Sequence, residues 1–147
     1  MLRVLAGLLA PIAGVVKRVG TVAWLGHDNA LKSSGTLGSE LRFWARLDGS
    51  SPSALAEAAD AFDLTPLMDF PVAVFSHGQR RRAALARVAA GGSKIWLLDE
   101  PEAGLDTRSR ARLEAALASH RARGGAVVVA AHGALDLPGA TGLRLGA

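Results

Sequence analysis

The sequence predicts an α/β fold whose core is interrupted by a helical insertion. Three short apolar runs, at residues 21–26, 94–100 and 126–132, have the length and composition of strands. The second and third runs lack polar alternation, as expected for parallel strands covered on both faces. About residues 29–75 carry only helix-like patterns, whereas strand-like and helix-like segments alternate afterwards. We therefore expect one domain over residues 1–147, with a helical subdomain inserted into an α/β core.

Apolar spacing, capping residues and glycines indicate where the helices lie. Leucines and Trp44 recur at helical spacing in the first helical segment, and glycine pairs stop the last two segments. Four helices are expected: over residues 37–47, from Ser51-Pro52 onward, from Gln79 to Ala90, and from after Asp106 to Gly124.

The composition restricts the possible chemistry. The chain has no cysteine, which excludes a disulfide framework, a thiolate metal site and a cysteine nucleophile. Its formal charge of +4 comes mostly from arginine, but aromatic residues are scarce, so a nucleic-acid groove is disfavoured. The longest uncharged run, residues 4–16, contains Pro11 and is shorter than the roughly 20 apolar residues that span a bilayer, so we expect no transmembrane helix.

Two adjacent carboxylates, Asp99 and Glu100, follow the apolar strand at residues 95–98. The carboxyl ends of parallel strands are where α/β sheets place their ligands. One carboxylate can hold Mg²⁺, directly or through water, while the next orients or deprotonates a water that attacks a phosphate. Solvated acids at the end of a strand are also common, so this pair alone favours nucleotide chemistry only modestly.

Two further elements suit phosphate chemistry. Ser76 is a suitable N-cap and Gly78 allows close backbone approach, so this helix start can offer free N–H groups to an anion. His132 ends the third apolar run, where an imidazole can bond a terminal phosphate or position a water. Taken singly, each is more often an ordinary capped helix or a surface histidine.

In combination and in this order, the motifs resemble those of the ATPase subunits of ABC transporters. The amino-acid sequence resembles that of the haem exporter ATPases of cytochrome c maturation (CcmA-type) over essentially the whole chain, including residues 24–32 and 36–47. Ser76-His77-Gly78-Gln79 matches the family signature, and residues 95–99 match the Walker B strand. Glu100 then matches the catalytic glutamate, Gly104-Leu105-Asp106 the D-loop, and His132 the switch histidine. His27 occupies the Q-loop position, which usually holds glutamine.

This resemblance implies a P-loop NTPase fold with a three-layer core, and a homodimer-like sandwich, or a pairing with a second ABC ATPase subunit, that holds ATP and Mg²⁺. Asp99 and His132 of one subunit, with Ser76 and Gly78 of the other, would hold each nucleotide. Glu100 would activate the water, and Asp99 would hold Mg²⁺ through water. His77 and Gln79 would also contact the nucleotide, and Asp106 would help to couple the two sites. The segment around His27 would contact integral membrane transporter subunits. The implied location is the cytoplasmic face of the bacterial inner membrane, with haem as cargo, no nucleic acid and no signal peptide.

The sequence departs from the family pattern at its beginning and in the signature. No Gly-Lys-Ser or Gly-Lys-Thr triplet occurs, so the phosphate loop and the strands before it are missing. Residues 2–11 therefore resemble the helix that follows a phosphate loop, and we expect a continuous apolar helix packed between the sheet and its neighbours. His77 stands where the family usually has glycine or alanine, which can assist phosphate binding or hinder closure.

Three hypotheses stay open at this point. The first is an ABC ATPase subunit of haem-exporter type whose sequence starts too late, and the second is a degenerate, non-hydrolysing module that docks on membrane partners. The retained Asp99, Glu100, Asp106 and His132 favour the first, because a binding module has little use for them. The third, a secreted or anchored protein with residues 1–16 as leader, lacks a clear cleavage site before Lys17.

Overall fold

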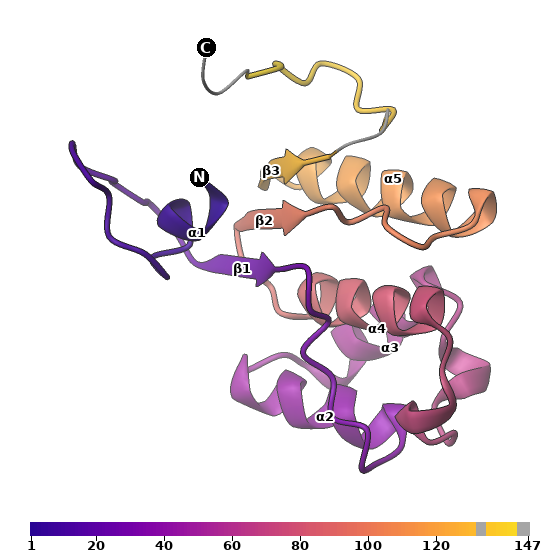
Figure 1. Ribbon diagram of the computed structural model, residues 1–147. Helices are drawn as coiled ribbons and strands as arrows, with labels where there is room; N and C mark the ends of the chain where they lie inside the picture. The colour runs from indigo at the N-terminus through magenta and orange to yellow at the C-terminus, as the bar shows by residue number, and fades with distance from the viewer. Residues whose placement is uncertain (132–134, 144–147) are drawn as a thin grey trace.

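The computed structural model describes residues 1–131 and 135–143 of the chain (Figure 1). The predicted switch histidine, His132, thus lies outside the described residues. In chain order the elements are α1 (Leu2–Leu5), β1 (Val22–Leu25), α2 (Leu37–Leu47), α3 (Pro52–Ala61), the 3-10 turns η1 (Thr65–Leu67) and η2 (Val72–Val74), α4 (His77–Ala90), β2 (Ile95–Asp99), α5 (Thr107–Ala122) and β3 (Ala126–Ala130).

The three strands form one parallel sheet in the order β1-β2-β3. Leu25 of β1 is paired with Leu98 of β2, and Asp99 is paired with Ala130 of β3. Each strand lies inside one of the predicted apolar runs. Since all three strands run the same way, their carboxyl ends meet at one edge of the sheet. The predicted α/β fold class is confirmed.

Helices α4 and α5 cover the sheet, with α4 against β1 and α5 against β3 (Figure 1). Ala83, Ala84 and Ala86 of α4 are fully buried, and their small side chains let this helix pack closely. Leu37 and Leu41 of α2 belong to the same buried cluster. The helices before α4 and the sheet therefore share one hydrophobic core.

Helices α2, α3, α4 and α5 begin at residues whose side chains cap the helix. The Ser51 hydroxyl accepts a hydrogen bond from the Ala54 amide at 3.1 Å, with Pro52 in the first turn of α3. Helix α4 begins two residues before the predicted Gln79, because Ser76 acts as its N-cap. The end of α4 at Ala90, before the glycine pair, is as predicted.

The predicted continuous helix at the beginning of the chain is wrong. Helix α1 ends at Leu5, and Gly7 adopts a left-handed φ of +79°, which a continuing right-handed helix does not allow. Leu2 is buried, but Leu8, Leu9 and Ile12 are exposed. Because this stretch finds little surface to pack against, its apolar composition does not produce a longer helix.

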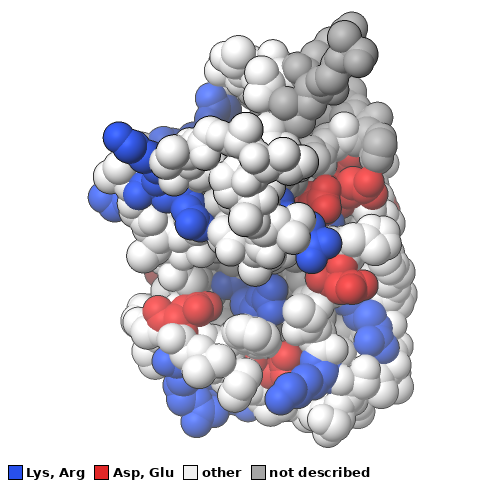
Figure 2. Space-filling view, turned by 60° about the vertical axis from the view of Figure 1, so that its left-hand side comes forward, with Lys and Arg blue, Asp and Glu red and all other residues white. Residues whose placement is uncertain are grey.

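Basic and acidic side chains both occur on the face seen in Figure 2, in several small groups.

In the described part of the chain, no helix combines the length and the apolarity needed to cross a bilayer.

Candidate functional site

The predicted carboxylate pair lies at the carboxyl edge of the sheet. Asp99 is the last residue of the central strand β2, Glu100 follows it, and both are half-buried. Glu100 has a left-handed φ of +48°, which is uncommon for a residue with a side chain. Its amide donates a 2.7 Å hydrogen bond to the Ala130 carbonyl of β3. The backbone therefore turns sharply at the point where the pair leaves the sheet.

The predicted signature residues form the start of α4. The Ser76 hydroxyl accepts from the Gln79 amide at 3.3 Å, and the Ser76 amide donates to the Gln79 side-chain oxygen at 2.8 Å. This reciprocal capping box satisfies two groups at the helix terminus. The predicted nucleotide contact Gln79 thus has a structural role in this arrangement. His77, the first residue of the helix, is exposed.

The start of α4 packs against the predicted D-loop. A Cβ added at Gly78 would lie 2.7 Å from the carbonyl oxygen of Gly104, so the two backbones touch. Gly104 has a φ of +72°, and a Cβ added there would overlap the His77 ring. The imidazole of His77 therefore lies over the glycine of the D-loop, and the structure brings two predicted motifs together.

Asp106, the predicted coupling residue, caps helix α5. Its carboxylate accepts a 2.7 Å hydrogen bond from the Ser109 amide. Hydrogen bonds from the side chain and the amide of Ser109 lower the pKa of Asp106. The carboxylate is therefore fixed at the start of α5, two residues after Gly104 of the D-loop.

His27, at the predicted Q-loop position, is exposed in the segment that follows β1. Two residues close to His27 in the sequence are hydrogen-bonded to α4. The carbonyl of Gly26 and the side chain of Asn29 accept hydrogen bonds of 2.8 and 3.1 Å from Arg81. This segment and α4 are thereby connected at the same edge of the sheet.

Arg81 is the residue of this site that the sequence reasoning missed. It lies in the second turn of α4 and is 1% exposed. Besides the segment after β1, its guanidinium bonds the carbonyl of Asp99 and, at 2.7 Å, the carbonyl of Glu100. Its spacing from Ala84, Leu85 and Val88, which are buried, follows the helical period and was the available signal.

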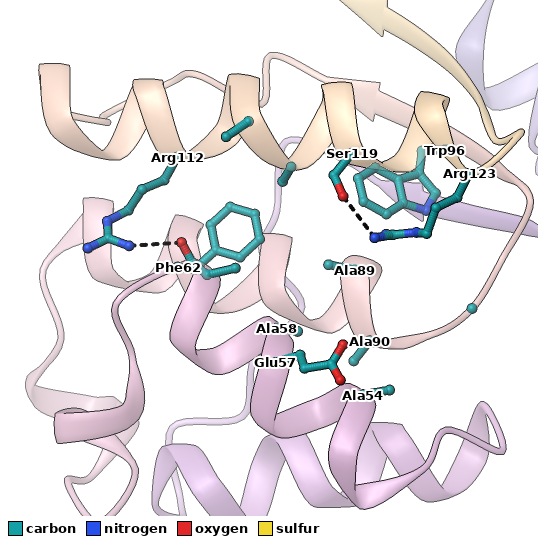
Figure 3. A pocket seen from close by; sticks show the side chains of 14 residues that line it. Ala54, Glu57, Ala58, Phe62, Ala89, Ala90, Trp96, Arg112, Ser119 and Arg123 are labelled. Atoms are coloured by element: carbon teal, nitrogen blue, oxygen red, sulfur yellow. Dashed lines mark hydrogen bonds between the residues drawn. The ribbon is translucent and has the colours of Figure 1, made fainter.

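A separate pocket of about 580 Å³ lies among α3, α4 and α5 (Figure 3). Half of the residues that line it are alanines, and Phe62 and Trp96 are its aromatic residues. Arg112 donates to the Ala61 carbonyl at 3.1 Å and Arg123 to the Ser119 hydroxyl at 2.8 Å. None of the predicted site residues lines this pocket, so we place the candidate site at the sheet edge.

The residues at the sheet edge fit part of a Mg-ATP site. Asp99 and Glu100 supply oxygen ligands of the kind Mg²⁺ prefers. Within the described ranges, however, no three His, Cys, Asp or Glu side chains gather into a group that could hold a metal on their own. The sequence also lacks the Gly-Lys-Ser/Thr triplet that would cradle the phosphates. The residues present therefore fit a Mg-ATP site only at the carboxylates Asp99 and Glu100 and at the signature segment, residues 76–79.

Comparison with known proteins gives the family. Residues 1–103 match the ABC transporter family. The chain belongs to this family. The matched residues include both carboxylates and the whole signature segment, so the resemblance stated on motifs alone is confirmed.

The chain is similar to proteins described as ATP-binding export proteins of cytochrome c biogenesis. The "Cytochrome c biogenesis ATP-binding export protein CcmA" of Sphingopyxis alaskensis is 49% identical over 99% of this chain and 75% of its own length. The protein of the same description from Gluconobacter oxydans is 48% identical over 93% of this chain. The chain spans 64% of that second relative, which is less than two thirds.

A solved structure shares the fold of this ABC family member. The structure titled "RNase-L Inhibitor" superposes with a TM-score of 0.72 at 27% identity. The similarity covers 87% of this chain and 25% of the other. The parallel sheet and its flanking helices thus follow the fold of known proteins.

Proposed function

We propose that this chain supplies the carboxylate and signature parts of the ATP-binding and ATP-hydrolysing subunit of an ABC transporter complex in cytochrome c biogenesis, acting in haem export or in haem release from its chaperone. Turnover would also need a Gly-Lys-Ser/Thr phosphate loop, which these 147 residues do not contain. The observation that carries the proposal is the Asp99–Glu100 pair, held beside the signature helix and the D-loop in a chain 49% identical to a CcmA protein. The alternative of a non-hydrolysing module gains no support from relatives described as ATP-binding export proteins.

In this proposal the residues divide the work as follows. Glu100, just outside the sheet, orients a water and takes its proton as the water attacks. Asp99 would hold Mg²⁺ through water, and the ion, when bound, would supply positive charge that neutralises the phosphates. The amino end of α4, with Ser76 and Gly78, presents N–H groups and a positive helix terminus to the nucleotide of a second copy.

Coupling to transport involves the periphery of the site. The proposed partners are a second copy, or another ABC ATPase subunit, and integral membrane subunits at the cytoplasmic face of the inner membrane. Asp106 would connect the two nucleotide sites, His132 would contact the terminal phosphate, and His27 would lie nearest the membrane subunits. Exposed Phe43 and Leu47 of α2 offer apolar surface to such subunits.

The first experiment measures Mg-ATP binding by the isolated 147-residue chain. We expect weak or undetectable affinity, because the sequence contains no Gly-Lys-Ser/Thr triplet to hold the phosphates. Isothermal titration with Mg-ATP checks this, with Mg-AMP as the control nucleotide. Micromolar affinity for Mg-ATP would contradict the expectation.

The second experiment tests Glu100 in a chain extended at its amino end by a strand and a Gly-x-x-x-x-Gly-Lys-Ser/Thr loop. Glu100→Gln should abolish turnover and leave nucleotide binding unchanged, because the amide keeps the shape but accepts no proton. Phosphate release and nucleotide titration measure the two effects. Unchanged turnover would remove Glu100 from the proposed role.

A further inference from the structure

The guanidinium of Arg81 is buried, which is rare for a charged side chain. A charge removed from water is costly unless hydrogen bonds and opposite charges replace its solvation. Burial lowers the pKa of Arg81, and the negative charges of Asp99, Glu102 and Glu100 oppose this effect. Four oxygen atoms compensate the burial: the carbonyls of Gly26, Asp99 and Glu100 and the Asn29 side chain.

These oxygens belong to segments that are distant in the sequence. Gly26 is 55 positions from Arg81, while Asp99 and Glu100 are 18 and 19 positions away. The guanidinium is planar and presents its donors in a fixed fork, so it sets the spacing of the groups that it joins. One side chain of α4 therefore fixes the segment after β1 relative to the end of β2.

The contact with Glu100 lies at a strained position. Glu100 has a left-handed φ of +48°, which neighbouring interactions must hold in place. Its carbonyl accepts from Arg81 at 2.7 Å and from the Ala103 amide at 3.0 Å, and its amide donates to Ala130. Arg81 is thus one of the groups that hold the turn from which the Glu100 side chain projects.

Neighbouring arginines of α4 make other contacts. Arg82 donates to the carbonyls of Phe62 and Asp63 at 2.9 and 3.0 Å. Arg87 lies over the Trp44 ring, 4.5 Å from its centroid. In the described structure neither contacts the end of β2, so Arg82 serves as a matched control from the same helix.

We propose that Arg81 is a positioning residue, which holds the backbone of Asp99 and Glu100 and connects it to the segment that carries His27. Arg81 acts through the carboxylate pair: its Nη1 and Nη2 atoms donate to protein oxygens, while its buried Nε has no hydrogen-bond partner among the described residues. Movement of α4, or of the segment after β1, would be transmitted to Glu100 through this side chain. The catalytic part of the inference rests on the proposed function of Glu100.

The first test uses amide hydrogen exchange on the 147-residue chain and needs no ATP. In Arg81→Met, the amides of Glu100 and Ala103 should exchange at least about tenfold faster, because the hydrogen bonds that order the end of β2 are lost. Arg81→Lys should give a smaller increase, and it carries the test if Arg81→Met fails to fold. Arg82→Met should leave these amides unchanged.

Two outcomes would overturn the inference at this stage. One is unchanged exchange at Glu100 and Ala103 in both Arg81 variants. The other is a uniform increase across the chain that Arg82→Met reproduces, because this would indicate a general loss of stability. A local increase specific to the Arg81 variants supports the inference.

The second test measures ATP turnover in the extended chain described above. Arg81→Met should lower kcat by about 10- to 100-fold with KM within about twofold, because misplacing a catalytic group slows chemistry more than binding. Arg81→Lys should recover part of kcat, and Arg82→Met should match the unmodified chain. An unchanged kcat in Arg81→Met, or an effect on KM alone, would overturn the positioning role.

The two tests separate this inference from the proposed function. If the unmodified extended chain hydrolyses no ATP, the proposed function fails, and hydrogen exchange alone judges the contact network of Arg81. If the unmodified chain is active and Glu100→Gln is not, the kinetic test applies in full.

Discussion

His120 shows how burial changes a single titratable group. Its ring stacks on Trp96 with centroids 4.0 Å apart and planes 12° apart, and a ring nitrogen lies 3.2 Å from the Lys94 carbonyl. Burial lowers the pKa of His120 below its ordinary value of 6.5, and the charge of Arg123 adds to this effect. Hydrogen bonds to the backbone at Lys94 and Ala126 oppose it. The folded protein therefore favours the neutral imidazole.

The stability of the chain should therefore depend on pH through His120. The unfolded state protonates near pH 6.5 and the folded state at a lower pH, so the unfolded state binds more protons in this range. The contribution is fully present above pH 6.5 and is lost as the pH falls through 6.5 toward the folded pKa. Urea unfolding between pH 8 and pH 5 measures it.

Matched variants isolate this contribution. His120→Gln should flatten the pH dependence between these limits, whereas His27→Gln, which changes an exposed histidine, should retain it. Equal slopes in His120→Gln and the unmodified chain would contradict the assignment.

At the scale of elements, the contact between α4 and the D-loop depends on two glycines. Gly78 leaves room for the Gly104 carbonyl, and Gly104 leaves room for the His77 ring. Gly104 also needs the left-handed φ of +72° that glycine adopts readily. The start of the signature helix is thus held against the segment that leads into α5.

Gly78→Ala should destabilise the chain even though alanine is the better helix former. The added Cβ would lie 2.7 Å from a backbone oxygen, which cannot move as a flexible side chain can. We expect a loss of about 1 to 3 kcal/mol in the free energy of unfolding, typical of overpacking. Chemical denaturation measures it.

Gly91→Ala, at the other end of α4, is the control. Its added Cβ would meet a carboxylate oxygen of Asp48 at 3.2 Å, and this exposed side chain can move away. Its effect should stay within about 0.5 kcal/mol. A loss in Gly91→Ala equal to that in Gly78→Ala would show that close approach to the D-loop is not the cause.

At the scale of the whole molecule, the outer edge of β3 is open to pairing. The Ala126 amide donates to Lys94 and the Ala130 carbonyl accepts from Glu100, so these residues direct their backbone groups toward β2. By alternation, the amides of Val127 and Val129 face the opposite side. The described residues place no strand there.

An unpaired edge of this kind favours association between chains. The isolated chain should therefore self-associate as its concentration rises, measured by sedimentation velocity. Val129→Pro removes an outward amide and should weaken association by about tenfold, whereas Val129→Thr keeps the amide and the side-chain shape and should not. A monodisperse unmodified chain at all concentrations would contradict this expectation.

The sequence by itself determined the features that depend on neighbouring residues. The three strands lie within their apolar runs, and helices begin after Ser51, Ser76 and Asp106, because side-chain caps and strand composition are local signals. The motif order also predicted the family that the comparison confirmed. Apolar composition alone was insufficient for residues 2–11, because a helix also needs a surface to bury against.

Only the tertiary structure decided which distant groups meet. The burial of Arg81 against oxygens up to 55 positions away, the stacking of His120 on Trp96, and the contact of Gly78 with Gly104 depend on how the sheet and helices pack. The helical period indicates that Arg81 faces the core, but it names none of these partners, since each contact joins different elements. The residue types of the site were therefore visible in the sequence, whereas the contacts that hold them required the fold.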